Sequence, residues 1–183
     1  MLSPYPPRAG GVAARGYPGG VPRPLRALAV ALAFGVIGTA LVSCSSSVGG
    51  LTPGPLANDP ACADVSVRLP DAIGDLDRRW TDAQATGAWG DPAAVLFTCG
   101  LEPTGPTTLR CISVGGVDWL VDESEAPRFR LTTYGRTPAA EVYVDNEIVS
   151  PNEALDAVAS AVLTLPQDAA CTEPETPIGE SEG

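Results

Sequence analysis

The feature that most constrains this chain is an uncharged apolar run that ends in a cysteine. The run covers residues 27–43 and closes on Leu41-Val42-Ser43-Cys44. A small residue before a cysteine at such a place is typical of a bacterial lipobox. The preceding residues 1–26 carry four arginines and no acidic residue, which is the layout of a secretory signal. We therefore expect cleavage before Cys44, lipid attachment to its thiol, and a domain that folds at the extracytoplasmic face of the cell membrane.

An uncleaved single membrane span is the alternative. The 17 uncharged residues of 27–43 lie at the short end of the spanning range of about 17–25 residues. Both interpretations leave the arginines in the cytoplasm and the rest of the chain outside. The lipoprotein is favoured because Cys44 stands where a signal cleavage site belongs, and a diacylglyceryl group supplies the two chains that stable anchoring needs. The long basic start also allows a true start codon downstream of Met1.

The sequence predicts four segments. Residues 1–43 form a lipoprotein signal segment with a disordered basic start, and residues 44–59, rich in Ser, Gly and Pro, form a flexible tether. Residues 60–171 form a disulfide-stapled domain, which is long enough for one core and not for two. Residues 172–183 carry four glutamates among small residues and prolines and form an acidic, disordered tail.

The exported part is strongly acidic. It holds all 22 acidic residues and seven of the 11 arginines, and lysine is absent, so its formal net charge is −15. Such a surface repels the phosphates of nucleic acid and anionic lipid headgroups, so nucleic acid is not expected as a partner. The charge also concentrates cations, although solubility is the favoured explanation for it.

The absence of histidine removes most common catalytic systems. Histidine-based acid–base chemistry, Ser-His-Asp and Cys-His nucleophiles and His-ligated zinc are all excluded. Schiff-base chemistry is excluded as well because there is no lysine. No pair of cysteines has the short spacing of a zinc site. We therefore expect a protein that is not an enzyme and has no cofactor and no metal.

Four cysteines follow the proposed anchor, which is an even number in an exported domain and indicates two disulfides. Three pairings exist. We expect one bond between Cys99 and Cys111, which would join two neighbouring strands. The other bond is expected between Cys62 and Cys171, which would tie the two ends of the domain together.

The patterns of apolar residues predict a single α+β domain of four to five mostly antiparallel strands with two to three helices. A short helix is expected over residues 71–81. Strands are expected over residues 93–99, 109–114, 117–121, 129–133 and 140–145, with Gly115-Gly116 as a tight turn between the second and third of them.

The clearest predicted helix begins at Ser150. Serine as N-cap, Pro151 at the first helical position and Glu153 three residues after the cap form a capping-box pattern. An apolar stripe at helical spacing continues from Leu155, and Pro166 is expected to end the helix.

Several segments of the domain resemble one family. The stretch 78–92 (RRWTDAQATGAWGDP), together with Thr98-Cys99-Gly100, the Arg110-Cys111 pair and residues 116–121 and 132–138, is similar to an exported actinobacterial family known as domain of unknown function number 3515. The resemblance covers roughly Cys62 to Cys171. Members typically show Arg-Cys-Gly where this chain has Thr98-Cys99-Gly100, so any role of that arginine is missing here. The resemblance implies an envelope-facing protein and implies no activity.

The densest polar cluster suggests a binding groove. Arginine offers a planar fork for carboxylate or phosphate groups, and tryptophan stacks on sugar rings or apolar groups, which would suit a cell-wall glycan or stem peptide. The candidate ligand-binding residues are Arg78, Arg79, Trp89, Asp91 and Arg136. The structural alternative, which we favour, places the tryptophan in the core beside a tight turn and leaves the arginines in ion pairs.

A carboxylate-based cell-wall hydrolase is the alternative function, since glycosidases need two carboxylates across a cleft. The candidates for that role are Asp82, Asp91, Asp118, Asp122 and Glu123. Solvated loop charge is the favoured explanation of the acidic residues after the strand at 117–121, ahead of catalysis or Ca²⁺ binding. Trp80, Trp119 and Tyr143 are expected to be buried or half-buried packing residues.

The sequence thus predicts an envelope lipoprotein attached to the membrane through Cys44. We expect it to act as a non-enzymatic binding or accessory module for a cell-wall component or an envelope protein. A protein with a purely structural or spacer role is the further alternative.

Overall fold

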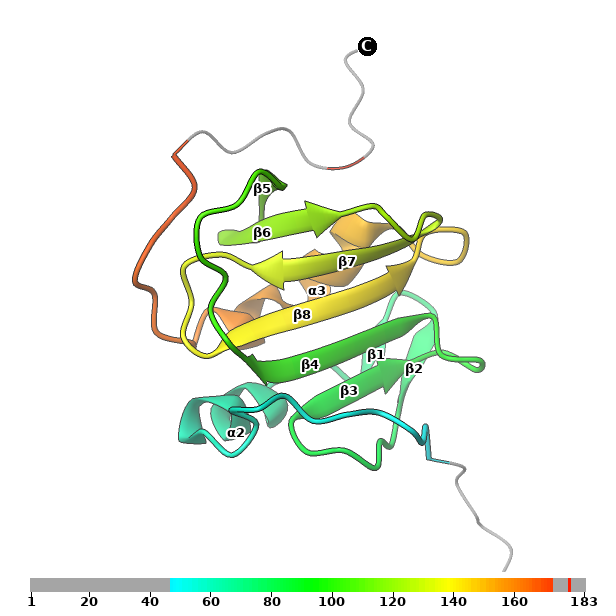
Figure 1. The fold of residues 1–183 in the computed structure, drawn as a ribbon. Coiled ribbons are helices and arrows are strands. Elements are labelled where there is room, and N and C mark those ends of the chain that lie inside the picture. The colour runs from blue at the N-terminus through cyan, green and yellow to red at the C-terminus, as the bar shows by residue number, and fades with distance from the viewer. Residues whose placement is uncertain (1–46, 173–177, 179–183) are drawn as a thin grey trace, which may run out of the picture. The chain divides into compact units, whose positions relative to one another are not determined.

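The computed structural model describes residues 47–172 and 178. They belong to a compact unit, Ser45–Gly183, that is built on one antiparallel sheet of eight strands with two helices (Figure 1). The predicted signal segment, Cys44 and nearly all of the predicted acidic tail lie outside the described residues. Among the described residues, no helix has both the length and the apolar character needed to cross a bilayer.

The helices and strands follow one another in a simple order along the chain. The helices are α2 (Pro60–Ser66) and α3 (Pro151–Val162). The strands are β1 (Ala72–Ile73), β2 (Leu76–Arg79), β3 (Thr86–Trp89), β4 (Val95–Leu101), β5 (Arg110–Val114), β6 (Val117–Asp122), β7 (Arg128–Thr133) and β8 (Ala139–Asp145).

The strand order in the sheet is β1-β2-β3-β4-β8-β7-β6-β5. Strands β1 to β4 form a meander, β5 to β8 form a second one, and the two meet where β4 pairs with β8. Leu96 lies opposite Tyr143 and Thr98 lies opposite Glu141 in that pairing. As a result β5, which follows β4 in the sequence, lies at the far edge of the sheet (Figure 1).

The core lies between the sheet and the two helices. Alternate residues of the strands are fully buried, as Val95, Phe97 and Cys99 of β4 show. Helix α3 contacts β8, β5 and β1, and α2 contacts α3 and β4. Because side chains alternate across a strand, the intervening residues of the same strands form the opposite face, which is polar and partly exposed.

The hairpin predicted around Gly115-Gly116 is confirmed. Strands β5 and β6 pair up to Val114 opposite Val117, and both glycines have positive φ angles, 60° and 77°. A two-residue turn between antiparallel strands requires such angles, and glycine adopts them without steric cost. The strands predicted over 129–133 and 140–145 are also present, as β7 and β8.

The last predicted helix is confirmed as α3, but its capping box is not formed. Ser150 is the N-cap and Pro151 opens the helix, yet the Ser150 side chain makes no capping hydrogen bond. Buried residues at helical spacing, among them Leu155, Val158 and Val162, face the sheet. The helix ends at Val162, before the predicted stop at Pro166.

The predicted fold class, an α+β domain of four to five strands, is wrong. Eight strands form one sheet and only two short helices occur among the described residues, so the fold is mostly β. The predicted helix over 71–81 is instead the β1–β2 hairpin, where Gly74 turns the chain with a φ of 54°. Helix α2 was missed, although Asp59 caps it by accepting a hydrogen bond from Ala61 N at 2.8 Å.

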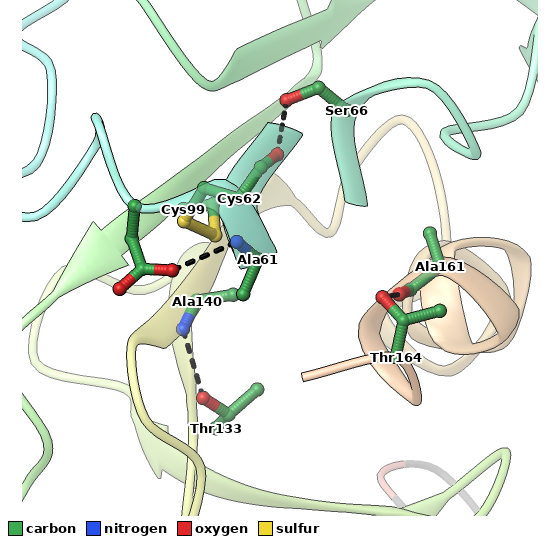
Figure 2. Close-up of a disulfide and its surroundings, with 9 residues drawn as sticks. Ala61, Cys62, Ser66, Cys99, Thr133, Ala140, Ala161 and Thr164 are labelled. Carbon is green, nitrogen blue, oxygen red and sulfur yellow. Dashed lines mark hydrogen bonds between the residues drawn. A yellow bond between two sulfur atoms is a disulfide. The ribbon is translucent and has the colours of Figure 1, made fainter. Parts of the chain in front are cut away.

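The predicted disulfide pairing is also wrong. Cys62 of α2 is bonded to Cys99 of β4 (Figure 2). Cys111 of β5 is bonded to Cys171. Three strands separate β4 from β5, so Cys99 and Cys111 are far apart in the sheet. Their side chains also lie on opposite faces, because Cys99 points to the helices while Cys111 pairs with Leu120 on the other face.

The described part of the predicted tether packs against the sheet. Leu56 N donates to Gly100 O at 2.7 Å, and Ala57 is buried. A Cβ at Gly100 would overlap the backbone of Ala57, and Gly100 has a φ of 98°. The packed unit therefore begins near Val48, ahead of the boundary predicted at residue 60.

Candidate functional site

Trp89, a predicted ligand contact, is a core residue. It is fully buried, and its Nε1 donates to Pro70 O at 3.1 Å. The contact joins β3 to the segment that links α2 to β1 and gives the buried indole N–H a partner. This placement agrees with the structural alternative for that residue.

Arg136, another predicted ligand contact, is buried behind the sheet with an exposed fraction of 3%. Its Nη1 donates to Leu165 O at 2.6 Å and to Leu163 O at 3.5 Å, just beyond the end of α3. Burial lowers the pKa of the guanidinium, and the nearby Asp118 carboxylate opposes that shift. A cation at the carboxyl end of a helix is favourable because the last carbonyls lack helical partners. Arg136 therefore binds the carbonyls that follow α3 and is not exposed for a ligand.

Arg78 and Arg79 are neighbours on β2 and bind different partners. Arg78 donates to Ser66 O at 3.3 Å and to Leu69 O at 3.2 Å, which holds the end of α2. Arg79 donates to Gly90 O at 3.2 Å and forms an ion pair with Asp91, with 2.8 Å between Nη1 and Oδ1. Of the five predicted ligand-binding residues, the structure thus joins Arg78, Arg79 and Asp91 at one edge of the sheet and leaves Trp89 and Arg136 in the interior.

A cavity of about 420 Å³ opens beside these arginines. We call it the Trp80 pocket. Its lining residues are Asp71, Arg78, Arg79, Trp80, Thr81 and Thr86.

Trp80 is the residue of this pocket that the sequence prediction placed wrongly. Its exposed fraction is 77%, whereas Trp89 and Trp119 are completely buried. Trp80 follows a charged pair and precedes Thr81-Asp82, so no alternating apolar pattern surrounds it. That polar context was the signal for an exposed indole.

The loop beneath Trp80 is held by short side-chain bonds. The Thr86 hydroxyl donates to Ala83 O at 2.6 Å and lies 2.8 Å from the Thr81 hydroxyl. Because Thr86 is buried and Thr81 lies beside it, the loop is fixed in shape. The pocket therefore has a preformed wall at this side.

A second polar cluster lies on the face of the sheet away from the helices. Arg130 contacts Glu141 at 2.7 Å and Glu125 at 3.2 Å, and lies 4.8 Å from the centre of the Tyr143 ring. The Tyr143 hydroxyl donates to Glu125 at 2.7 Å. That bond, with the help of Arg130, lowers the pKa of Glu125. The same bond raises the pKa of Tyr143, and Arg130 opposes that shift. The carboxylate stays charged and the phenol stays protonated, so the cluster holds no poised acid or base.

The five carboxylates of the hydrolase hypothesis bind five different partners. Asp82 accepts from Gly50 N, Asp91 pairs with Arg79, Asp118 accepts from Cys171 N, Asp122 accepts from Ser124 N, and Glu123 pairs with Arg110. The bonds from Ser124 lower the pKa of Asp122, while a general acid needs a raised one. Across the described ranges, no three His, Cys, Asp or Glu side chains gather in a way that could hold a metal ion.

Comparison with known proteins gives one match. Residues 26–170 match the family described as "Protein of unknown function (DUF3515)". No curated protein and no solved structure matches the chain. The matched region covers most of the sequence and includes every strand of the sheet. The chain therefore belongs to the DUF3515 family.

Proposed function

We propose that this protein is a non-enzymatic binding module, attached to the outer face of the cytoplasmic membrane, that recognises a cell-wall component at the Trp80 pocket. The exposed indole carries the proposal. A tryptophan is among the largest apolar side chains, and keeping it in water forgoes about 1.5–3 kcal/mol of burial. The fold buries both other tryptophans completely, so the exposure of Trp80 sets it apart.

The lining of the pocket suits a ligand with sugar hydroxyls and a carboxylate. The indole offers a flat apolar surface, and the threonine hydroxyls and the Asp71 carboxylate line the same space as Arg78 and Arg79. Arginine N–H groups bind carboxylates in a fixed fork geometry. A wall glycan with its peptide side chain carries both kinds of group.

Membrane attachment through Cys44 completes the proposal. The lipobox pattern at Leu41–Cys44 and the arginines before it support cleavage and acylation. Two acyl chains hold a protein on a bilayer stably. The Cys62–Cys99 and Cys111–Cys171 bonds fit an oxidising location outside the cytoplasm.

Calorimetric titration tests the ligand. The full chain in detergent micelles is titrated with soluble muropeptides that carry a disaccharide and a stem peptide. Trp80→Ala is expected to abolish binding because it removes the stacking surface. Leu109→Ala, which truncates another exposed apolar residue at the opposite edge of the sheet, is expected to leave it unchanged. Binding that survives Trp80→Ala would place the site elsewhere.

A further inference from the structure

The start of the described chain is fixed beside Trp80. Val48 N donates to Trp80 O at 2.7 Å, and Asp82 N donates to Val48 O at 3.4 Å, so Val48 forms a parallel bridge with Thr81. Gly50 N donates to the Asp82 carboxylate at 3.1 Å. These bonds hold the chain at Val48 against the backbone that carries the exposed indole.

Covalent geometry then limits how far Trp80 lies from the membrane. Consecutive Cα atoms are 3.8 Å apart, so the four peptide units between Cys44 and Val48 span at most about 15 Å. If residues 27–43 are an uncleaved span instead, five units from Ser43 reach about 19 Å. In both cases the bilayer surface lies within this reach of Val48.

We infer that the edge of the sheet that carries Trp80 lies on the outer surface of the bilayer, with the Trp80 indole at the level of the lipid headgroups. This inference rests on the membrane attachment in the proposed function and does not depend on the wall ligand. Tryptophan is enriched at membrane interfaces because its ring is apolar while its N–H stays hydrated. All three tryptophans of the sequence lie among the residues that the structure describes, and Trp80 is the only one of them left exposed.

Because the lipid anchor already holds the protein on the membrane, a contact through one residue is enough to keep this edge of the sheet on the bilayer. A single indole binds a bilayer weakly on its own. The tether converts that contact into an intramolecular event with an effective concentration in the millimolar range. A consequence is that the Trp80 pocket opens at the membrane surface, so the wall component that it binds has to reach that surface.

Depth-dependent fluorescence quenching tests the inference. The lipidated full chain is reconstituted into phosphatidylcholine vesicles with bromine atoms on the lipid chains. Trp89 and Trp119 are buried in the core, and Trp80→Phe removes the emission of Trp80 alone. We expect brominated lipid to quench the part of the fluorescence that is lost in Trp80→Phe. We expect aqueous iodide to leave that part of the fluorescence largely unquenched. Quenching by iodide with no effect of brominated lipid would overturn the inference.

A matched variant tests orientation. Leu109 is exposed and precedes β5, six strand spacings or about 29 Å from β2. In a Trp80→Phe background, Leu109→Trp is expected to be quenched by iodide and not by lipid. Equal lipid quenching at both positions would show that no particular edge faces the bilayer and would overturn the inference.

The outcomes separate the two proposals. Lipid quenching of Trp80 without muropeptide binding supports the docked edge and refutes the wall ligand. Muropeptide binding by a chain whose Trp80 is quenched by iodide alone supports the ligand and refutes the docked edge. Sedimentation with vesicles, compared between the chain that begins at lipidated Cys44 and the unlipidated chain from Ser45 onward, checks the lipid attachment independently of both.

Discussion

Individual arginines in this fold act on backbone carbonyls as much as on carboxylates. Arg78 and Arg136 each hold a chain segment that follows a helix, at the ends of α2 and α3. Their guanidinium groups satisfy oxygen atoms that have no partner in the helix. Sequence patterns did not indicate this role, because it depends on which loop comes to rest over which helix end.

Replacement of Arg136 should destabilise the protein strongly. Arg136→Ala leaves the buried carbonyl of Leu165 and the part-buried carbonyl of Leu163 without their donor, and an unsatisfied buried group costs about 1–3 kcal/mol. We expect a loss of about 3 kcal/mol in the free energy of unfolding, measured by urea denaturation. Arg128→Ala, at an exposed ion pair with Asp145, should cost less than about 1 kcal/mol. Equal losses from the two variants would contradict the role given to Arg136.

The Tyr143–Glu125 hydrogen bond gives a pH-dependent prediction. It lowers the pKa of Glu125, so its stabilising effect is present above the ordinary glutamate pKa and is lost as the pH falls through the folded-state value. Tyr143→Phe removes the main cause, and the pKa of Glu125 should rise toward its ordinary value in an NMR titration of the side-chain carboxyl. Tyr134→Phe removes a hydroxyl that has no such bond to Glu125 and should leave that pKa unchanged. A Glu125 pKa unaffected by Tyr143→Phe would refute the assignment.

Among the helices, strands and turns, the sequence predicted those that depend on residues close together in the chain. The Gly115-Gly116 turn, strands β7 and β8 and helix α3 all arise from short-range patterns. The β1–β2 hairpin was mistaken for a helix because charged residues over 71–81 also fit a helical face, and β3 was missed because Trp89 was assigned to a turn. The pairing of β4 with β8 joins residues 38 to 49 positions apart, and no local pattern encodes it. The disulfide prediction failed for the same reason.

The Cys62–Cys99 bond joins α2 to the middle of the sheet and should stabilise the fold substantially. It closes a loop of 37 residues, which corresponds to about 4 kcal/mol in the chain-entropy model. The double variant Cys62→Ala, Cys99→Ala should lose that amount in urea denaturation. Non-reducing peptide mapping should recover Cys62 linked to Cys99 and Cys111 linked to Cys171. Recovery of a Cys99–Cys111 peptide would contradict the strand order.

At the scale of the whole molecule, charge and anchoring act in opposite directions. The chain after Cys44 has a formal net charge of −15, and an anionic bilayer repels such a surface at low ionic strength. With the proposed lipid on Cys44, the short connection from Cys44 to Val48 would nonetheless keep the Trp80 edge near the bilayer. The indole must therefore supply the attraction that charge does not.

This opposition predicts how docking responds to lipid composition. With phosphatidylglycerol added to the phosphatidylcholine vesicles, quenching of Trp80 by brominated lipid should weaken at low salt, because the acidic surface is pushed away from the anionic headgroups. The quenching should recover at about 1 M salt, where the Debye length is only about 3 Å. Pure phosphatidylcholine vesicles are the control and should show little dependence on salt. Stronger quenching on the anionic vesicles at low salt would mean that Arg78 and Arg79 outweigh the net negative charge at this edge. In that case charge attraction, and not the indole, would hold the domain on the membrane.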